Sequence, residues 1–120
     1  MTTVAILGAS NKPERYSYKA QTLLKEYGHT PVPVSLHDDK VLGIPAVSQL
    51  SEITEAVDTV TIYINPQHLH PVLPQIEALK PRRVIFNPGS EDSAAISRLR
   101  HQGIEVEEAC TLVLLRTEQF

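Results

Sequence analysis

The sequence predicts an α/β fold of the Rossmann-like type, a three-layer arrangement in which helices cover both faces of a parallel sheet. Short apolar runs typical of buried strands alternate along the chain with segments of helical periodicity. The first apolar run, Val4–Leu7, ends directly at a glycine, which is typical of a strand buried on both faces. Because 120 residues suit one hydrophobic core, residues 1–120 are expected to form a single domain.

The first half of the chain predicts one strand-helix-strand unit. After the strand Val4–Leu7, apolar residues recur at helical spacing over Tyr16–Tyr27, and Gly28 stands where a left-handed residue ends a helix. Valines alternate with prolines over Thr30–Ser35. This segment is expected to be a strand near a sheet edge, because proline cannot donate a hydrogen bond to a neighbouring strand. Residues 37–47 are polar and predict a turn-rich connection.

A short helix and a second buried strand are expected next. Ser48 is expected to cap a short helix that buries Leu50 and Ile53. β-Branched and apolar residues over 56–64 predict the strand, which the dipeptide Asn65-Pro66 closes.

Prolines divide the segment that follows. Residues 66–70 are expected to form a separate turn before a helix over about 71–79, because proline is tolerated only in the first turn of a helix. Val84–Phe86 is the next predicted strand. The tripeptide Asn87-Pro88-Gly89 ends it.

The last third predicts a helix, a strand and an apolar tail. Ser90, followed by two acidic residues, is expected to cap a helix that ends near Gly103. Ile104–Val106 predicts a last short strand. Residues 109–115 are apolar, and we favour a helix that packs back on the sheet.

Composition and charge exclude several classes of partner. The formal net charge of -3 gives no basic field to hold nucleic acid, and no apolar run is long enough to span a membrane. Cys110 is the single cysteine, so no internal disulfide forms, and the first residues lack the charge pattern of a secretory signal. A cytoplasmic protein with neither nucleic acid nor membrane as partner is expected.

The fold class predicts where a ligand binds. In open parallel sheets, ligands bind outside the carboxyl ends of the strands, where the strand order reverses. Three loop regions follow predicted strands: residues 8–17, residues 35–40, and the pair formed by residues 65–66 with residues 87–89. We therefore expect the functional residues in these loops.

The first loop suits a phosphate but not the usual dinucleotide pattern. A dinucleotide fingerprint has three glycines, whereas this loop has glycine only at its first position, Gly8. It offers instead the hydroxyls of Ser10 and Ser17, the cations Lys12 and Arg15, backbone N–H groups and the start of a helix.

The end of the second strand also argues against NAD. Recognition of NAD expects an acidic residue there to bind the ribose, but Ser35 occupies the position and the first carboxylate after it is that of Asp38. A ligand with an additional phosphate fits this pattern better.

The order of motifs along the chain resembles that of the small bacterial CoA-binding proteins. The segments are VAILGASNKPERYSYKA, PVPV, IPAVSQL, VDTV, NPGSE and EEAC. These proteins are similar to the CoA-binding domain of the succinyl-CoA synthetase α subunit, and the resemblance covers nearly the full chain.

The resemblance implies a set of coenzyme A contacts. It implies that residues 10–12 line the phosphates together with Ser17, and that Ser35 approaches the adenosine. It further implies that Lys40 lies near the 3′-phosphate and that the loops after the third and fourth strands form the opposite wall of the site. The complete set of predicted cofactor-binding residues is Gly8, Ala9, Ser10, Asn11, Lys12, Arg15, Ser17, Ser35, Lys40, Asn65, Asn87, Pro88 and Gly89.

The leading hypothesis is a non-catalytic module that binds coenzyme A or an acyl-CoA through its ADP moiety. No Ser-His-Asp order, carboxylate pair or metal-ligand spacing stands out, and a structural role is favoured for Cys110 over a reactive thiol. One alternative is a subunit of an acyl-CoA ligase or transferase that a separate chain completes, which implies a protein partner; a homo-oligomer also stays open. An NAD(P)-binding redox sensor is a further, less favoured alternative.

Overall fold

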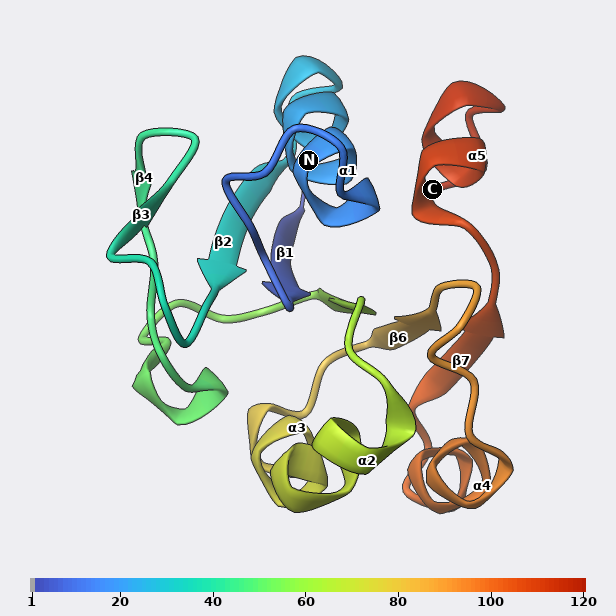
Figure 1. Ribbon diagram of the computed structural model, residues 1–120. Coiled ribbons are helices and arrows are strands. Elements are labelled where there is room, and N and C mark those ends of the chain that lie inside the picture. Colours follow the sequence, from blue (N-terminus) through green and yellow to red (C-terminus); the bar gives the residue numbers. More distant parts are fainter. Residues whose placement is uncertain (1) are drawn as a thin grey trace.

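A computed structural model describes residues 2–120 and contains a five-stranded parallel sheet with the order β2-β1-β5-β6-β7 (Figure 1). The strands are β1 (Thr3–Leu7), β2 (Thr30–Val34), β5 (Thr59–Ile62), β6 (Arg83–Phe86) and β7 (Glu105–Glu108). The helices are α1 (Tyr16–Glu26), α2 (Pro66–Leu69), α3 (Leu73–Leu79), α4 (Ser93–His101) and α5 (Thr111–Arg116), with 3₁₀ turns η1 (Leu50–Glu52) and η2 (His70–Val72).

Helices cover both faces of the sheet, which confirms the predicted Rossmann-like fold. Figure 1 shows α1 and α5 on one side and α2, α3 and α4 on the other. Each side has its own buried cluster: Val4, Ile6 and Leu24 belong to the first, and Phe86 and Leu99 to the second. The chain runs outward from β1 in one direction and from β5 in the other, so right-handed crossovers place the two sets of helices on opposite faces.

Most of the predicted elements are confirmed. The first strand, the helix α1 and the edge position of β2 agree with the sequence prediction. Helix α5 packs back on the sheet beside α1, with Leu112, Leu114 and Leu115 buried. Leu50 and Ile53 are buried, as expected for the short helix that precedes β5. Within residues 2–120, no helix combines the length and apolar character that a membrane span requires.

A small hairpin occupies the segment where a turn-rich connection was predicted. Its strands are β3 (Lys40–Val41) and β4 (Ile44–Pro45), which pair antiparallel. The residues between them, Leu42 and Gly43, have φ angles of 52° and 76°, and positive φ at both central residues is typical of a type I′ hairpin turn. Strands of two residues are too short to show a two-residue period in the sequence, so the prediction missed them.

Two predicted helix caps are wrong. The carboxylate of Asp92, and not Ser90, caps α4 by accepting a hydrogen bond from the Ala95 N–H at 3.0 Å. Ser90 donates its hydroxyl to the Asn87 carbonyl at 2.7 Å, so it closes the preceding turn. Ser48 likewise lies outside η1, whose N-cap is Gln49.

The proline-rich segment is more helical than predicted. Residues 66–69 form α2 rather than a non-helical turn, and Asn65 caps it by accepting from the His68 N–H at 3.0 Å. Helix α3 begins at Leu73 rather than near Pro71, because η2 comes between α2 and α3. Each of the three prolines lies in the first turn of a helical segment, where the missing proline N–H costs no hydrogen bond. They are Pro66 in α2, Pro71 in η2 and Pro74 in α3.

Candidate functional site

The strand order reverses between β1 and β5, and their carboxyl ends bring two loops together. Gly8 follows β1 with a φ of +95°, which favours glycine. A Cβ atom at this position would lie 2.9 Å from Ile64 Cγ2 and 3.3 Å from the carbonyl oxygen of Tyr63, both in the connection after β5. Glycine therefore lets these two loops pack closely at the point where a ligand binds in folds of this class.

The start of the β1–α1 loop is hydrogen-bonded to the neighbouring strand. The N–H groups of Gly8 and Ala9 both donate to the carbonyl oxygen of Val34, at 3.2 and 3.0 Å. The hydroxyl of Ser10 accepts a hydrogen bond from the Lys12 N–H at 3.1 Å. The N–H groups of Gly8 and Ala9 thus hold the loop against β2, and both are already hydrogen-bonded within the protein.

The end of the same loop is suited to an anion. The first helical hydrogen bond runs from the Lys19 N–H to the Arg15 carbonyl, so the N–H groups of residues 16–18 are the orphan donors of α1. In the described part of the chain, no acidic residue lies in the first turn of this helix and Arg15 makes no side-chain cap. Lys12 and Arg15 are exposed, and Ser17 is buried at the helix start. The helix dipole and two cations thus favour negative charge here.

Asn11 connects this loop to the β3–β4 hairpin. Its Nδ2 donates to the Lys40 carbonyl at 2.7 Å, and its Oδ1 accepts from the Leu42 N–H at 3.0 Å. The Lys40 side chain is exposed. The structure therefore brings Asn11 and Lys40 together, through the backbone of Lys40 rather than through its charge.

Ser35 organises the loop after β2. It is buried, and its hydroxyl accepts hydrogen bonds from the N–H groups of Asp38 at 3.2 Å and His37 at 3.4 Å. The exposed apolar side chain of Leu36 follows it, with 78% of its surface accessible. Ser35 therefore sets the path of the chain toward the hairpin.

Asn87 is a buried amide with three hydrogen bonds inside the protein. It donates to Thr61 Oγ1 at 2.6 Å and to the Ile62 carbonyl at 2.9 Å, and it accepts from the Thr111 N–H at 2.9 Å. The amide joins the ends of β5 and β6 to the start of α5. Its polar atoms are thus engaged by the protein, whereas Pro88 and Gly89, which follow it, are exposed.

A polar cluster beside Asn87 was not predicted from the sequence. Thr61 and Thr111 share a hydrogen bond of 2.8 Å between their hydroxyls. The buried hydroxyl of Tyr63 lies nearby, and burial raises the pKa of Tyr63 to about 12. Residues 61 and 111 are far apart in the chain, and threonine is common in strands, so spacing gave no signal for this cluster.

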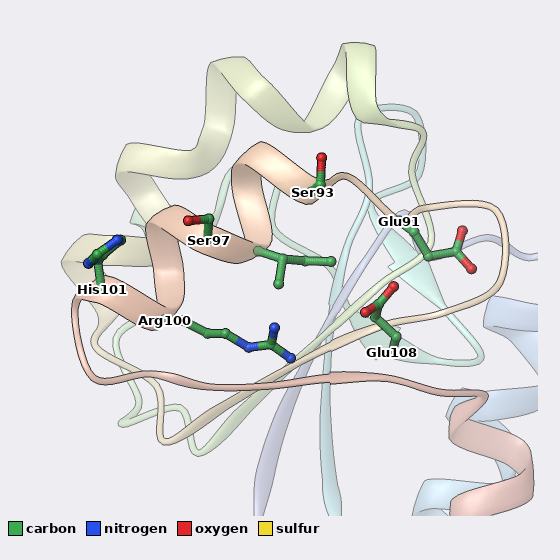
Figure 2. Close-up of a pocket in the computed structure, with 7 residues that line it drawn as sticks. Glu91, Ser93, Ser97, Arg100, His101 and Glu108 are labelled. Carbon is green, nitrogen blue, oxygen red and sulfur yellow. The ribbon is translucent and has the colours of Figure 1, made fainter.

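A groove on the described surface lies away from the strand reversal. It has a volume of about 610 Å³ and lies beside α4 and the end of β7, the outermost strand of the sheet. Figure 2 shows His101 and Arg100 toward one end and Glu108 and Glu91 toward the other. The donor Arg100 Nη2 lies 3.3 Å from the Val106 carbonyl, so this arginine covers part of the free strand edge. None of the predicted site residues lines the groove.

Comparison with known proteins identifies relatives of this chain. A family model described as a CoA binding domain matches residues 2–116. The uncharacterized protein YneT of Bacillus subtilis is 32% identical over 66 residues, which are 55% of this chain and 49% of that protein. The alpha subunit of acetate–CoA ligase [ADP-forming] II of Pyrococcus furiosus is 36% identical over 62 residues, which are 51% of this chain and 14% of that subunit. The chain therefore spans about half of the first relative and a small part of the second.

A solved structure shares the whole fold. The crystal structure of an uncharacterized protein superposes with a TM-score of 0.95 at 42% identity, covering 100% of this chain and 98% of that one. The family model matches residues 2–116. The strand order and the start of α1, which favours an anion, are consistent with that match. The chain belongs to the CoA binding domain family.

Proposed function

We propose that this protein binds coenzyme A or an acyl-CoA through its ADP moiety, at the loops that follow β1, β2, β5 and β6, without itself catalysing a reaction. The observation that carries the proposal is the start of α1, where orphan N–H groups lie beside Lys12 and Arg15 in a member of a CoA binding domain family. The loop has one glycine and the end of β2 has Ser35, so the requirements for NAD are not met.

The predicted residues divide into two roles in this proposal. Ser10, Lys12, Arg15 and Ser17 bind the diphosphate, and Lys40 binds the 3′-phosphate. The second role is to shape the site through contacts with the protein itself. Its residues are Gly8, Ala9, Asn11, Ser35, Asn65 and Asn87. Pro88 and Gly89 contribute exposed surface to the opposite wall.

A second candidate is a subunit of an acyl-CoA ligase or transferase completed by another chain. The 36% identity to part of the alpha subunit of an acetate–CoA ligase favours it. In this case the present chain holds the coenzyme, and the partner supplies the residues that form the thioester. Co-purification with a partner and acyl-CoA formation by the pair would support this candidate. A chain that stays alone in cell extract would argue against it.

A thermal-shift panel tests the leading proposal. A ligand that binds only the folded state stabilises it by RT ln(1 + [L]/Kd), about 2.7 kcal/mol at a hundredfold excess over Kd. For a domain of this size that is a shift of several degrees in Tm. We expect CoA and acetyl-CoA to raise Tm clearly, and NAD, NADP and ATP to raise it less. If CoA, acetyl-CoA and dephospho-CoA all leave Tm unchanged, the proposal is wrong.

A further inference from the structure

The β3–β4 hairpin depends on its surroundings for its position. Each of its strands has two residues, and a two-stranded ribbon of this size is not stable alone in water. Val41 is buried in the core beside Leu24 of α1, whereas Lys40 on the same strand is exposed. The groups that hold the backbone of residues 40–42 therefore set the position of the Lys40 Cα atom, from which the side chain extends.

Two side-chain amides hold three consecutive residues of this hairpin. Gln21 of α1 donates its Nε2 to the Val41 carbonyl at 2.9 Å, and Asn11 bonds to the carbonyl of Lys40 and the N–H of Leu42. Gln21 is 1% exposed and belongs to the helix core, so its contact is part of the fold. Asn11 is exposed and lies in the loop between Ser10 and Lys12. The hydrogen bonds of Asn11 link the hairpin directly to the loop proposed to bind phosphate.

The geometry of the Asn11 contact constrains the two backbone segments that carry Lys12 and Lys40. A single amide makes both hydrogen bonds, at 2.7 and 3.0 Å, so the loop that carries Lys12 and the strand that carries Lys40 are fixed side by side. Exposed ion pairs usually contribute little, because ordering two long side chains costs entropy. A backbone held in place removes part of that cost and makes an exposed lysine a more selective ligand for phosphate.

We propose that Asn11 is a positioning residue that does not touch the ligand, and that it sets the preference for CoA over dephospho-CoA by holding Lys40 at the 3′-phosphate. This inference rests on the proposed function. It gives Asn11 a role that differs from the one the resemblance implies, and the basis is that the amide nitrogen and the amide oxygen each bond to the hairpin.

Calorimetric titration with CoA and dephospho-CoA tests this role in the wild type, Asn11→Ala, Lys40→Ala and the double variant. The wild type is expected to prefer CoA by about tenfold or more, the range of one charge-assisted hydrogen bond. Lys40→Ala should abolish the preference, and Asn11→Ala should remove most of it although Lys40 is still present. The double variant should show no further loss. Lys25→Ala, which removes the same charge from the last turn of α1, should keep the preference.

Hydrogen exchange in the absence of ligand tests the contact itself. Asn11→Ala should speed exchange of the Leu42 amide, because that N–H loses its acceptor, and should leave the amides of β1 protected. Equal affinity of the wild type for the two ligands, or a full preference in Asn11→Ala, would overturn the inference while the proposed function stands. Failure of the wild type to bind either ligand would overturn both.

Discussion

Asn87 and Asn65 are side-chain amides at the ends of neighbouring strands, and they differ in burial. Asn87 is 2% exposed and makes three hydrogen bonds, whereas Asn65 is exposed and caps α2 with one. Removing the Asn87 amide leaves buried partners unsatisfied, so Asn87→Ala should cost about 3 kcal/mol or more of unfolding free energy. Asn65→Ala should cost about 1 kcal/mol, as the loss of an N-cap does. Urea unfolding of both variants measures the difference, and equal costs would contradict it.

Gly8 and Gly89 have nearly the same φ, +95° and +94°, but different surroundings. A Cβ on Gly8 would crowd Ile64 and the backbone of Tyr63, whereas one on Gly89 would meet nothing within 4 Å. Gly89→Ala should therefore cost only the backbone strain of about 1–2 kcal/mol. Gly8→Ala should cost about 1–3 kcal/mol more, because it also overpacks the junction between the two loops. Denaturant unfolding checks this pair, and a Gly8→Ala variant no less stable than Gly89→Ala would show that the close approach is unimportant.

Lys12 is the exposed cation nearest the turn of the β1–α1 loop in sequence. If it meets the phosphates, Lys12→Ala should weaken CoA binding by about 1.5–3 kcal/mol, the range of a hydrogen bond to a charged group, without changing Tm in the absence of ligand. Titration calorimetry measures the affinity. Lys25→Ala is the control, since it removes the same charge at the opposite end of α1. Unchanged affinity in Lys12→Ala would assign the loop a scaffold role.

The residues of the candidate site were predictable to different degrees. Gly8, Lys12 and Arg15 follow an apolar strand directly, so the sequence places them at a sheet edge without further information. The partners of Asn11 and Asn87 are 24 to 31 residues away in the chain. Whether an amide is free or already hydrogen-bonded depends on such distant contacts, and residue spacing does not report them.

At the scale of single elements, the amino ends of the strands contain a pH-sensitive contact. His29 Nδ1 lies 3.0 Å from Thr2 Oγ1 and accepts from the Thr2 N–H, and its ring packs against Phe120. Burial and the nearby charge of Arg83 hold the pKa of His29 below 6.5. The unfolded chain therefore binds more protons than the folded one just below that pH, and stability falls as the pH drops from 6.5 toward the folded pKa.

Unfolding free energy measured between pH 8 and pH 5 should show this loss. His29→Gln should flatten that part of the profile, because it removes the group that titrates. A wild-type profile that is flat, or that rises as the pH falls to 5, would contradict the assignment to His29.

Elements with several buried residues were predicted well, and short ones were not. Strands β1 and β6 contain continuous apolar runs, and helix α1 has enough apolar residues to show a helical period. The hairpin β3–β4 has four strand residues, and its place depends on amides from elsewhere in the chain. The cap of α4 was misassigned because Ser90 and Asp92 are both good caps, and only the hydrogen bond from Ala95 distinguishes them.

At the scale of the whole molecule, the strand order explains the location of the site. The strand order reverses between β1 and β5, which is where ligands bind in folds of this class, and α1 follows β1 directly. Alternation of strands and helices predicted this arrangement, because right-handed crossovers allow few others. The groove beside α4 is at the opposite edge of the sheet from β2, and the proposed coenzyme site is the strand reversal instead.

Titration of the purified chain with CoA and with NAD in the same buffer is the most direct test of the proposed coenzyme site. We expect saturable binding of one CoA per chain, with NAD binding at least tenfold more weakly, because the loop has cations and helix N–H groups but lacks the glycines and the ribose carboxylate. The affinity for CoA should fall as the salt concentration rises, because salt screens the attraction between the charges on the ligand and the exposed cations of the loop. No measurable binding of CoA, or binding of NAD as tight as that of CoA, would contradict the proposed site.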